Sequence, residues 1–211
     1  MEKMKKTDKI KLTEEYVRQG LRDYDSGHDW WHIERVRRMA LLINRKESGI
    51  DPFNVEIAAL LHDSADSKFI TGDIDKRYED VMIFMEKNGM NRITEQIINV
   101  IRNISFSNKM PADTLSNPLL HVISDADKLD ALGAIGIARA FNYGGFRNNL
   151  IFNPDNIQQI STTIGHFYHK LLKLKDMMYT DTGRCLAVER HKFLEVFLEQ
   201  FYSEWNMDIK I

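Results

Sequence analysis

The adjacent residues His62 and Asp63 have side chains that could bind a metal ion and take part in catalysis. The pair ends an apolar run, residues 57–61, that otherwise has the composition of a buried core segment. An imidazole and a carboxylate are costly to bury without partners, and one metal ion satisfies both. His32 and Asp127 supply two more side chains of the same kinds. The order of these four residues predicts a metal centre assembled from separate helices.

The donor set of this predicted centre narrows the choice of metal. Two imidazoles and two carboxylates form a mixed nitrogen and oxygen set, which suits Mn²⁺, Fe²⁺, Co²⁺, Ni²⁺ or Zn²⁺ and tolerates Mg²⁺ less well. Four protein ligands around an octahedral ion leave two positions, one for water and one for a phosphate oxygen. We therefore expect one divalent metal ion as the cofactor, with Mn²⁺ favoured, at a site open enough for catalysis.

The segments that must position these residues have the patterns of helices. The spacing of Ile33, Val36, Ala40 and Ile43 predicts a helix after the two tryptophans. Asp51–Pro52 is a helix start signal, and this helix should run to about His62–Asp63. Further helices are expected at about 75–88, 93–104, 118–141, 156–178 and 184–205. No strand pattern is convincing, so we expect an all-α fold, a single globular multi-helix bundle.

Composition excludes several classes of protein. The chain has 211 residues, 43% of them hydrophobic, which is enough for a sizeable core. A net charge of −2 gives no reason to expect nucleic-acid or membrane partners. The lysine-rich start lacks the apolar stretch of a signal peptide, and no run could span a bilayer. A single cysteine, Cys185, fits a reducing, cytoplasmic location. The sequence leaves the oligomeric state open, and a homodimer is one option.

The motifs extend beyond the four candidate ligands. The chain contains the blocks GHDWWHIERVRRMA, ALLHDSADSKF, SDADKLDALGAIGIARAFNYGG and HFYHKLLKLKDMMYTDTGRCLAVERHKFLEVFL. These blocks resemble the HD-domain superfamily of metal-dependent phosphohydrolases, and within it a small bacterial subfamily linked to nucleotide pyrophosphohydrolase activity. The resemblance covers most of residues 12–205. It implies a single HD domain over 1–211, with a core of about 12–145 and a C-terminal helical pair of about 156–205.

The resemblance also assigns roles to residues. It implies that His32, His62, Asp63 and Asp127 are the metal ligands. Asp66, one helical turn after His62, would orient or deprotonate the water that attacks phosphorus. The substrate class implied is a nucleotide or a related phosphate ester, with release of pyrophosphate from nucleoside triphosphates.

Basic residues near the motifs are candidates for contacts with phosphate. Lys68 and Lys128 directly flank ligand motifs, so Lys68 is expected to act in catalysis and Lys128 in substrate binding. Lys170 and Lys173 lie about one helical turn apart and could face the same pocket.

Other interpretations stay open at this point. Asp125 competes with Asp127 as a ligand, and His28 is more easily read as ordering the helix entrance than as a ligand. The same metal chemistry would serve a phosphodiesterase of cyclic or signalling nucleotides. A non-catalytic nucleotide-sensing module would retain the site without turnover.

Overall fold

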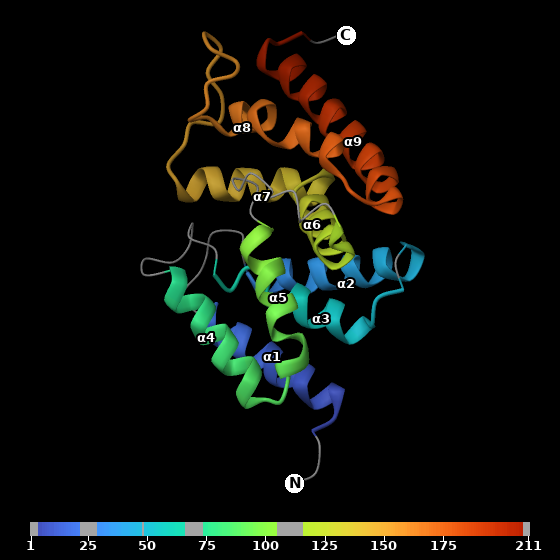
Figure 1. Ribbon diagram of the computed structural model, residues 1–211. Coiled ribbons are helices and arrows are strands. Elements are labelled where there is room, and N and C mark those ends of the chain that lie inside the picture. Colours follow the sequence, from blue (N-terminus) through green and yellow to red (C-terminus); the bar gives the residue numbers. More distant parts are fainter. Residues whose placement is uncertain (1–3, 22–28, 48, 66–73, 105–115, 209–211) are drawn as a thin grey trace. The chain divides into compact units, whose positions relative to one another are not determined.

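The computed structural model describes residues 4–21, 29–47, 49–65, 74–104 and 116–208. As predicted, the fold is all-α; within these ranges the extended pairing is confined to one isolated bridge, between Leu150 and Thr162. The chain divides into two compact units, Met1–Ala126 and Asp127–Ile211, each with its own helices (Figure 1).

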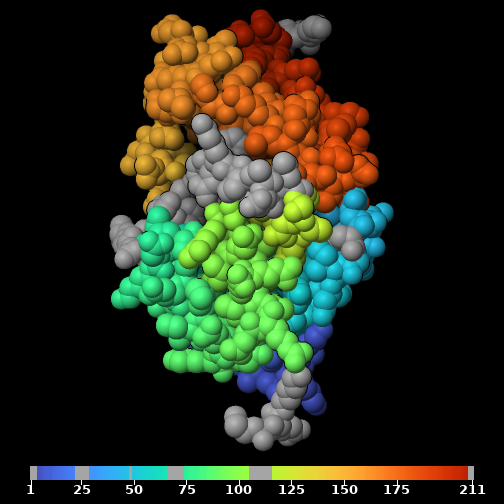
Figure 2. Space-filling view, viewed as in Figure 1, coloured from blue at the N-terminus to red at the C-terminus, as the bar shows by residue number. Residues whose placement is uncertain are grey.

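The first unit is arranged around helix α3. Its helices are α1 (Lys6–Gly20), α2 (Trp30–Glu47), α3 (Pro52–Leu61), α4 (Ile74–Lys87), α5 (Asn91–Asn103) and most of α6 (Pro118–Asp130). Helix α3 contacts α1, α2 and α5, and its residues 57–61 are fully buried. Side chains of α4 and α5 pack together over one face of this unit (Figure 2). An apolar run buried on every side fixes the helix end that carries the His62–Asp63 pair.

The sequence signals of α2 and α3 are confirmed. Ile33, Val36, Ala40 and Ile43 are all buried along one side of α2. At the start of α3, the side chain of Asp51 accepts a hydrogen bond from the backbone N–H of Phe53, with proline at the first helical position. Helix α1 was not among the predicted helices.

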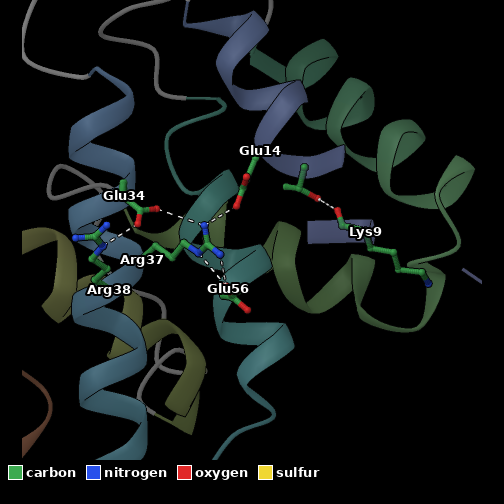
Figure 3. A network of polar contacts seen from close by, with 7 residues as sticks. Lys9, Glu14, Glu34, Arg37, Arg38 and Glu56 are labelled. Carbon is green, nitrogen blue, oxygen red and sulfur yellow. Dashed lines mark hydrogen bonds and ion pairs between the residues drawn. The ribbon is translucent and has the colours of Figure 1, made fainter. Parts of the chain in front are cut away.

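Arg37 joins three helices of the first unit through its guanidinium group (Figure 3). It donates to Glu14 on α1 at 2.6 Å, to Glu34 on α2 at 3.3 Å and, through Nε, to Glu56 on α3 at 2.9 Å. Its side chain is only 18% exposed. These charged hydrogen bonds raise the pKa of Arg37 despite the opposing effect of burial, so the group stays charged. The cluster therefore holds α1 and α2 against α3.

We expect Arg37→Met to lower the free energy of unfolding by about 2 kcal/mol, because three half-buried carboxylates lose their shared partner. Arg38→Met is the matched control. Arg38 pairs with Glu34 but its side chain is 76% exposed, and such surface pairs contribute little. Urea denaturation of both variants measures the difference. Equal losses would contradict the assigned role of the cluster.

Asp51 gives the first unit a contribution to stability that depends on pH. The hydrogen bond from Lys6, and then the one from the Phe53 N–H, lower the pKa of Asp51. A carboxyl with a lowered pKa stabilises the fold above its unfolded pKa, about 3.9, and this contribution is lost as pH falls through the folded value. Wild type should therefore exceed Asp51→Asn in stability at pH 7, and the gap should close below about pH 4. Thermal melts across this range test it, and a gap independent of pH would contradict it.

The second unit contains the end of α6, followed by α7 (Gly133–Phe146), α8 (Thr163–His169), a 3-10 helix η2 (Leu171–Met177) and α9 (Asp181–Trp205). Helix α9 contacts α7 and η2, and α8 contacts both α7 and η2. Nowhere in the described ranges is a helix sufficiently long and apolar to cross a membrane.

Two predicted helices of this region are wrong in their extent. The helix expected over 118–141 is two helices, because Leu132 is extended and Gly133 adopts a positive φ of 68°. The helix expected over 156–178 begins only at Thr163, where the side chain of Thr162 caps it, and continues after Lys170 as a 3-10 helix. The first error comes from the backbone at Leu132 and Gly133, and the second from a stretch of turns over 156–162 that precedes the Thr162 cap.

Candidate metal centre

The end of α3 fixes the orientation of His62. This residue follows the last residue of the helix and still has helical backbone angles. Its Nδ1 lies 2.8 Å from the backbone carbonyl of Ala59. A carbonyl oxygen only accepts, so Nδ1 must carry the proton that it donates. In the neutral imidazole, Nε2 then presents a lone pair.

The start of α2 fixes the backbone of His32. The carboxylate of Asp29 accepts a hydrogen bond from the backbone N–H of His32 at 2.8 Å, which caps the first turn. The His32 side chain is fully buried. We assigned no role to Asp29 from the sequence, although an acidic residue three positions before a ligand at a helix start is a recognisable capping signal.

Asp63 brings the two histidines together. Its Oδ2 lies 3.3 Å from Nε2 of His32, and its Oδ1 lies 3.3 Å from Nε2 of His62. The ring centroids of the two histidines are 5.3 Å apart. One donor atom from each of the three residues lies within 4.8 Å of the others. The predicted cluster of His32, His62 and Asp63 therefore exists inside the first unit.

This arrangement calls for a cation. Nε2 of His62 is buried and makes no hydrogen bond, so its lone pair faces a carboxylate oxygen. Two electron-rich atoms at that separation repel each other unless a proton or a metal ion lies between or beside them. Ligands about 2.1 Å from one ion are themselves roughly 3.0–3.4 Å apart, which matches both contacts of Asp63. The residues present thus fit a bound divalent metal.

The remaining predicted site residues are not joined to this cluster by the structure. Asp127 lies on α6 as the first residue of the second unit, so its part as a fourth ligand stays a prediction. Asp66, Lys68 and His28 lie outside the described residues. Asp125 is fully buried on α6.

The predicted substrate-binding lysines all lie in the second unit. Lys128 Nζ donates to the carbonyl of Met177 at 3.1 Å and stands 4.4 Å from the ring centroid of Tyr179. Lys170 is half-buried at the end of α8, and Lys173 is exposed on η2. Their roles toward substrate stay predictions.

Several solved bacterial protein structures resemble the chain along nearly its whole length. An HD-superfamily hydrolase from Bacillus thuringiensis is 38% identical, with a TM-score of 0.77 over 96% of this chain and 99% of its own. This chain belongs to the HD superfamily of hydrolases. The membership confirms the resemblance seen in the motifs. A predicted HD superfamily hydrolase from an uncultured Thermotogales bacterium, 24% identical with a TM-score of 0.59, shares the fold. No protein-family model matches the sequence.

Another similar protein is YpgQ of Bacillus subtilis. It is 38% identical over 210 residues, which cover 97% of this chain and 96% of YpgQ. A crystal structure of YpgQ in complex with ADP matches 92% of this chain and 97% of its own, with a TM-score of 0.77 and 36% identity.

Family and geometry together define the general chemistry. The chain is a metal-dependent phosphohydrolase, and HD hydrolases bind a divalent metal. His32, His62 and Asp63 are positioned to hold that ion. Either a proton or a metal ion could lie beside Nε2 of His62, and membership of the HD superfamily favours the metal ion.

Proposed function

We propose that this HD hydrolase cleaves nucleotides and releases pyrophosphate from nucleoside triphosphates. The observation that carries the proposal is the pair of contacts from His32 and His62 to the two oxygens of Asp63, which create a place for a cation. The ADP bound in the YpgQ complex supports a nucleotide as the substrate class, because YpgQ and this chain match over nearly their full lengths.

Each residue of the proposed centre has a defined task. His32, His62 and Asp63 hold a divalent ion, Mn²⁺ in our proposal, and Asp127 is proposed as the fourth ligand. The bound ion would polarise a phosphate oxygen and lower the pKa of a water molecule toward neutrality. Nδ1 of His62, fixed by the Ala59 carbonyl, keeps Nε2 directed at the centre.

The remaining candidates handle water and phosphate charge. Asp66 is proposed to orient the attacking water and accept its proton. Lys68, Lys128, Lys170 and Lys173 are proposed to neutralise charge on the phosphates and the leaving pyrophosphate. The water oxygen bonds to the α-phosphorus. At the same time the bond breaks between the α-phosphorus and the oxygen that bridges it to the β-phosphorus, and this oxygen leaves with the pyrophosphate. The products are a nucleoside monophosphate and pyrophosphate.

A substrate screen with Mn²⁺ tests the proposal. Purified protein is incubated with nucleoside triphosphates, monophosphates, cyclic nucleotides and guanosine tetraphosphate, and pyrophosphate and orthophosphate are measured separately. We expect pyrophosphate from the triphosphates. In water enriched in ¹⁸O, the label should appear in the nucleoside monophosphate, because attack at the α-phosphorus places the new oxygen there.

The other outcomes have distinct meanings. Turnover restricted to cyclic or signalling nucleotides would replace the proposal with a phosphodiesterase. Release of orthophosphate alone would place the attack at a terminal phosphorus. A rise in melting temperature with nucleotide, without any product, would indicate a sensing module and overturn the proposal.

A further inference from the structure

A second polar site lies in the C-terminal unit, between η2 and the N-terminal half of α9. It is a solvent-open groove of about 550 Å³, and its polar lining residues are Lys175, Asp176, Arg184, His191, Lys192 and Glu195. Its volume is in the range of small-molecule sites, roughly 300–1,000 Å³. None of the four proposed metal ligands lines it.

His191 is the buried polar group of this groove. Its side chain is only 9% exposed, and its Nε2 lies 3.3 Å from Oε1 of Glu195, one turn further along α9. Nδ1 is buried and has no hydrogen-bond partner within the described part of the chain. A lone pair on Nε2 would face the carboxylate oxygen at 3.3 Å, so in the neutral ring the proton belongs on Nε2.

His191 thus has the opposite polarity to His62. Because Nδ1 of His62 donates to the Ala59 carbonyl, that ring offers a lone pair at Nε2, which suits a cation. The ring of His191 offers an N–H at Nε2, which suits an anion. In this structure the carboxylate of Glu195 lies where such an anion would bind. Its side chain is 56% exposed, so it can rotate out into the solvent at a small cost in free energy.

Arg184 supplies a fixed positive group at the same groove. Its Nη1 donates to the carbonyls of Met178 at 3.1 Å and Tyr179 at 2.9 Å, and its Nη2 pairs with Asp181. A guanidinium has five N–H groups, so these contacts hold its plane in place and leave donors for a ligand.

The two lysines add charge at the same groove. Lys175 pairs with Asp176 at 3.0 Å and Lys192 with Glu189 at 3.3 Å. Exposed ion pairs of this kind exchange readily for a stronger anion.

We infer that this groove binds a phosphate group, with Arg184, Lys175 and Lys192 around it and the Nε2–H of His191 donating to it. A phosphate carries up to two negative charges and accepts several hydrogen bonds. It should therefore bind the donors of this groove more strongly than the single carboxylate of Glu195 and displace it. The phosphate could be inorganic or part of a nucleotide. The inference does not depend on the proposed catalytic activity.

Titration with inorganic phosphate, AMP and adenosine, followed by the ¹⁵N resonances of the His191 ring, tests the inference. The His191→Gln variant identifies those resonances. We expect phosphate and AMP, but not adenosine, to shift them, and tighter binding of AMP would show that the groove also contacts the nucleoside. Arg184→Gln should weaken phosphate binding at least about tenfold. Glu195→Gln should tighten it, because it removes the competing carboxylate.

Glu199→Gln is the matched control, since it removes the same charge one turn further along α9 from a residue that does not line the groove. It should leave phosphate binding close to that of wild type. The inference is overturned if phosphate leaves the His191 resonances unmoved, or if Glu195→Gln and Glu199→Gln change the affinity equally. Because no readout is turnover, such a failure would leave the proposed function untouched.

Discussion

A His62→Ala variant is expected to lose metal binding by at least about a hundredfold, and with it the hydrolysis of nucleotides. His62 is 2% exposed, and its Nε2 is held toward Asp63 by the hydrogen bond from Nδ1 to Ala59. Alanine removes the Nε2 donor atom, so of the three clustered residues only His32 and Asp63 remain to hold the ion. Isothermal titration with Mn²⁺ measures the metal affinity, and release of pyrophosphate from a nucleoside triphosphate measures activity.

Two further variants make this result interpretable. Asp63→Asn keeps the volume of the side chain but removes the charge that both histidines face, so it should show the same loss if His62→Ala fails to fold. His169→Ala is the histidine control. His169 lies in the second unit, where its exposed ring contacts the carbonyl of Gln158. The clustered metal ligands lie in the first unit, so metal binding should stay at the wild-type level. A metal-free His62→Ala protein that turned over nucleotide at the wild-type rate would refute the proposed function.

Gly136→Ala is expected to destabilise the second unit by about 3 kcal/mol. A Cβ atom at this position would lie 2.2 Å from the carbonyl oxygen of Ala131 and 2.3 Å from its carbonyl carbon. Both are backbone atoms at the break between α6 and α7, so the chain itself must move. Urea denaturation followed by circular dichroism gives the change in the free energy of unfolding.

Gly145→Ala is the matched control within the same helix. No heavy atom lies within 4 Å of a Cβ placed there, so the substitution should be neutral or stabilising by up to about 1 kcal/mol. The contrast separates a steric effect from helix propensity, since both variants make the same chemical change. Equal stability of the two variants would show that the α6–α7 break tolerates a side chain.

Local signals in the sequence were sufficient for several parts of the fold. Asp51–Pro52 predicted the start of α3, and the apolar spacing from Ile33 to Ile43 predicted α2. These features depend on a capping hydrogen bond and on one buried helix face, both of which are set within a few residues. The break at Gly133 was missed, because a single positive φ leaves the apolar pattern around it unchanged.

By itself, the sequence determined which residues could form a metal centre. A histidine and an aspartate at the end of a buried helix are costly without a partner, and the surrounding motifs identified the HD superfamily, which similarity to the Bacillus thuringiensis hydrolase confirms. Residue types and their order are sufficient for that conclusion because metal chemistry restricts the donors that can serve.

Only the tertiary structure decided how those donors are used. Packing of α2 on α3 sets the contacts of His32 and His62 with separate oxygens of Asp63, and the Ala59 carbonyl selects the tautomer of His62. The same holds for His191, which lines a groove of basic and acidic side chains. A histidine's role depends on which nitrogen holds the proton, and the hydrogen-bond partners in the folded chain determine that.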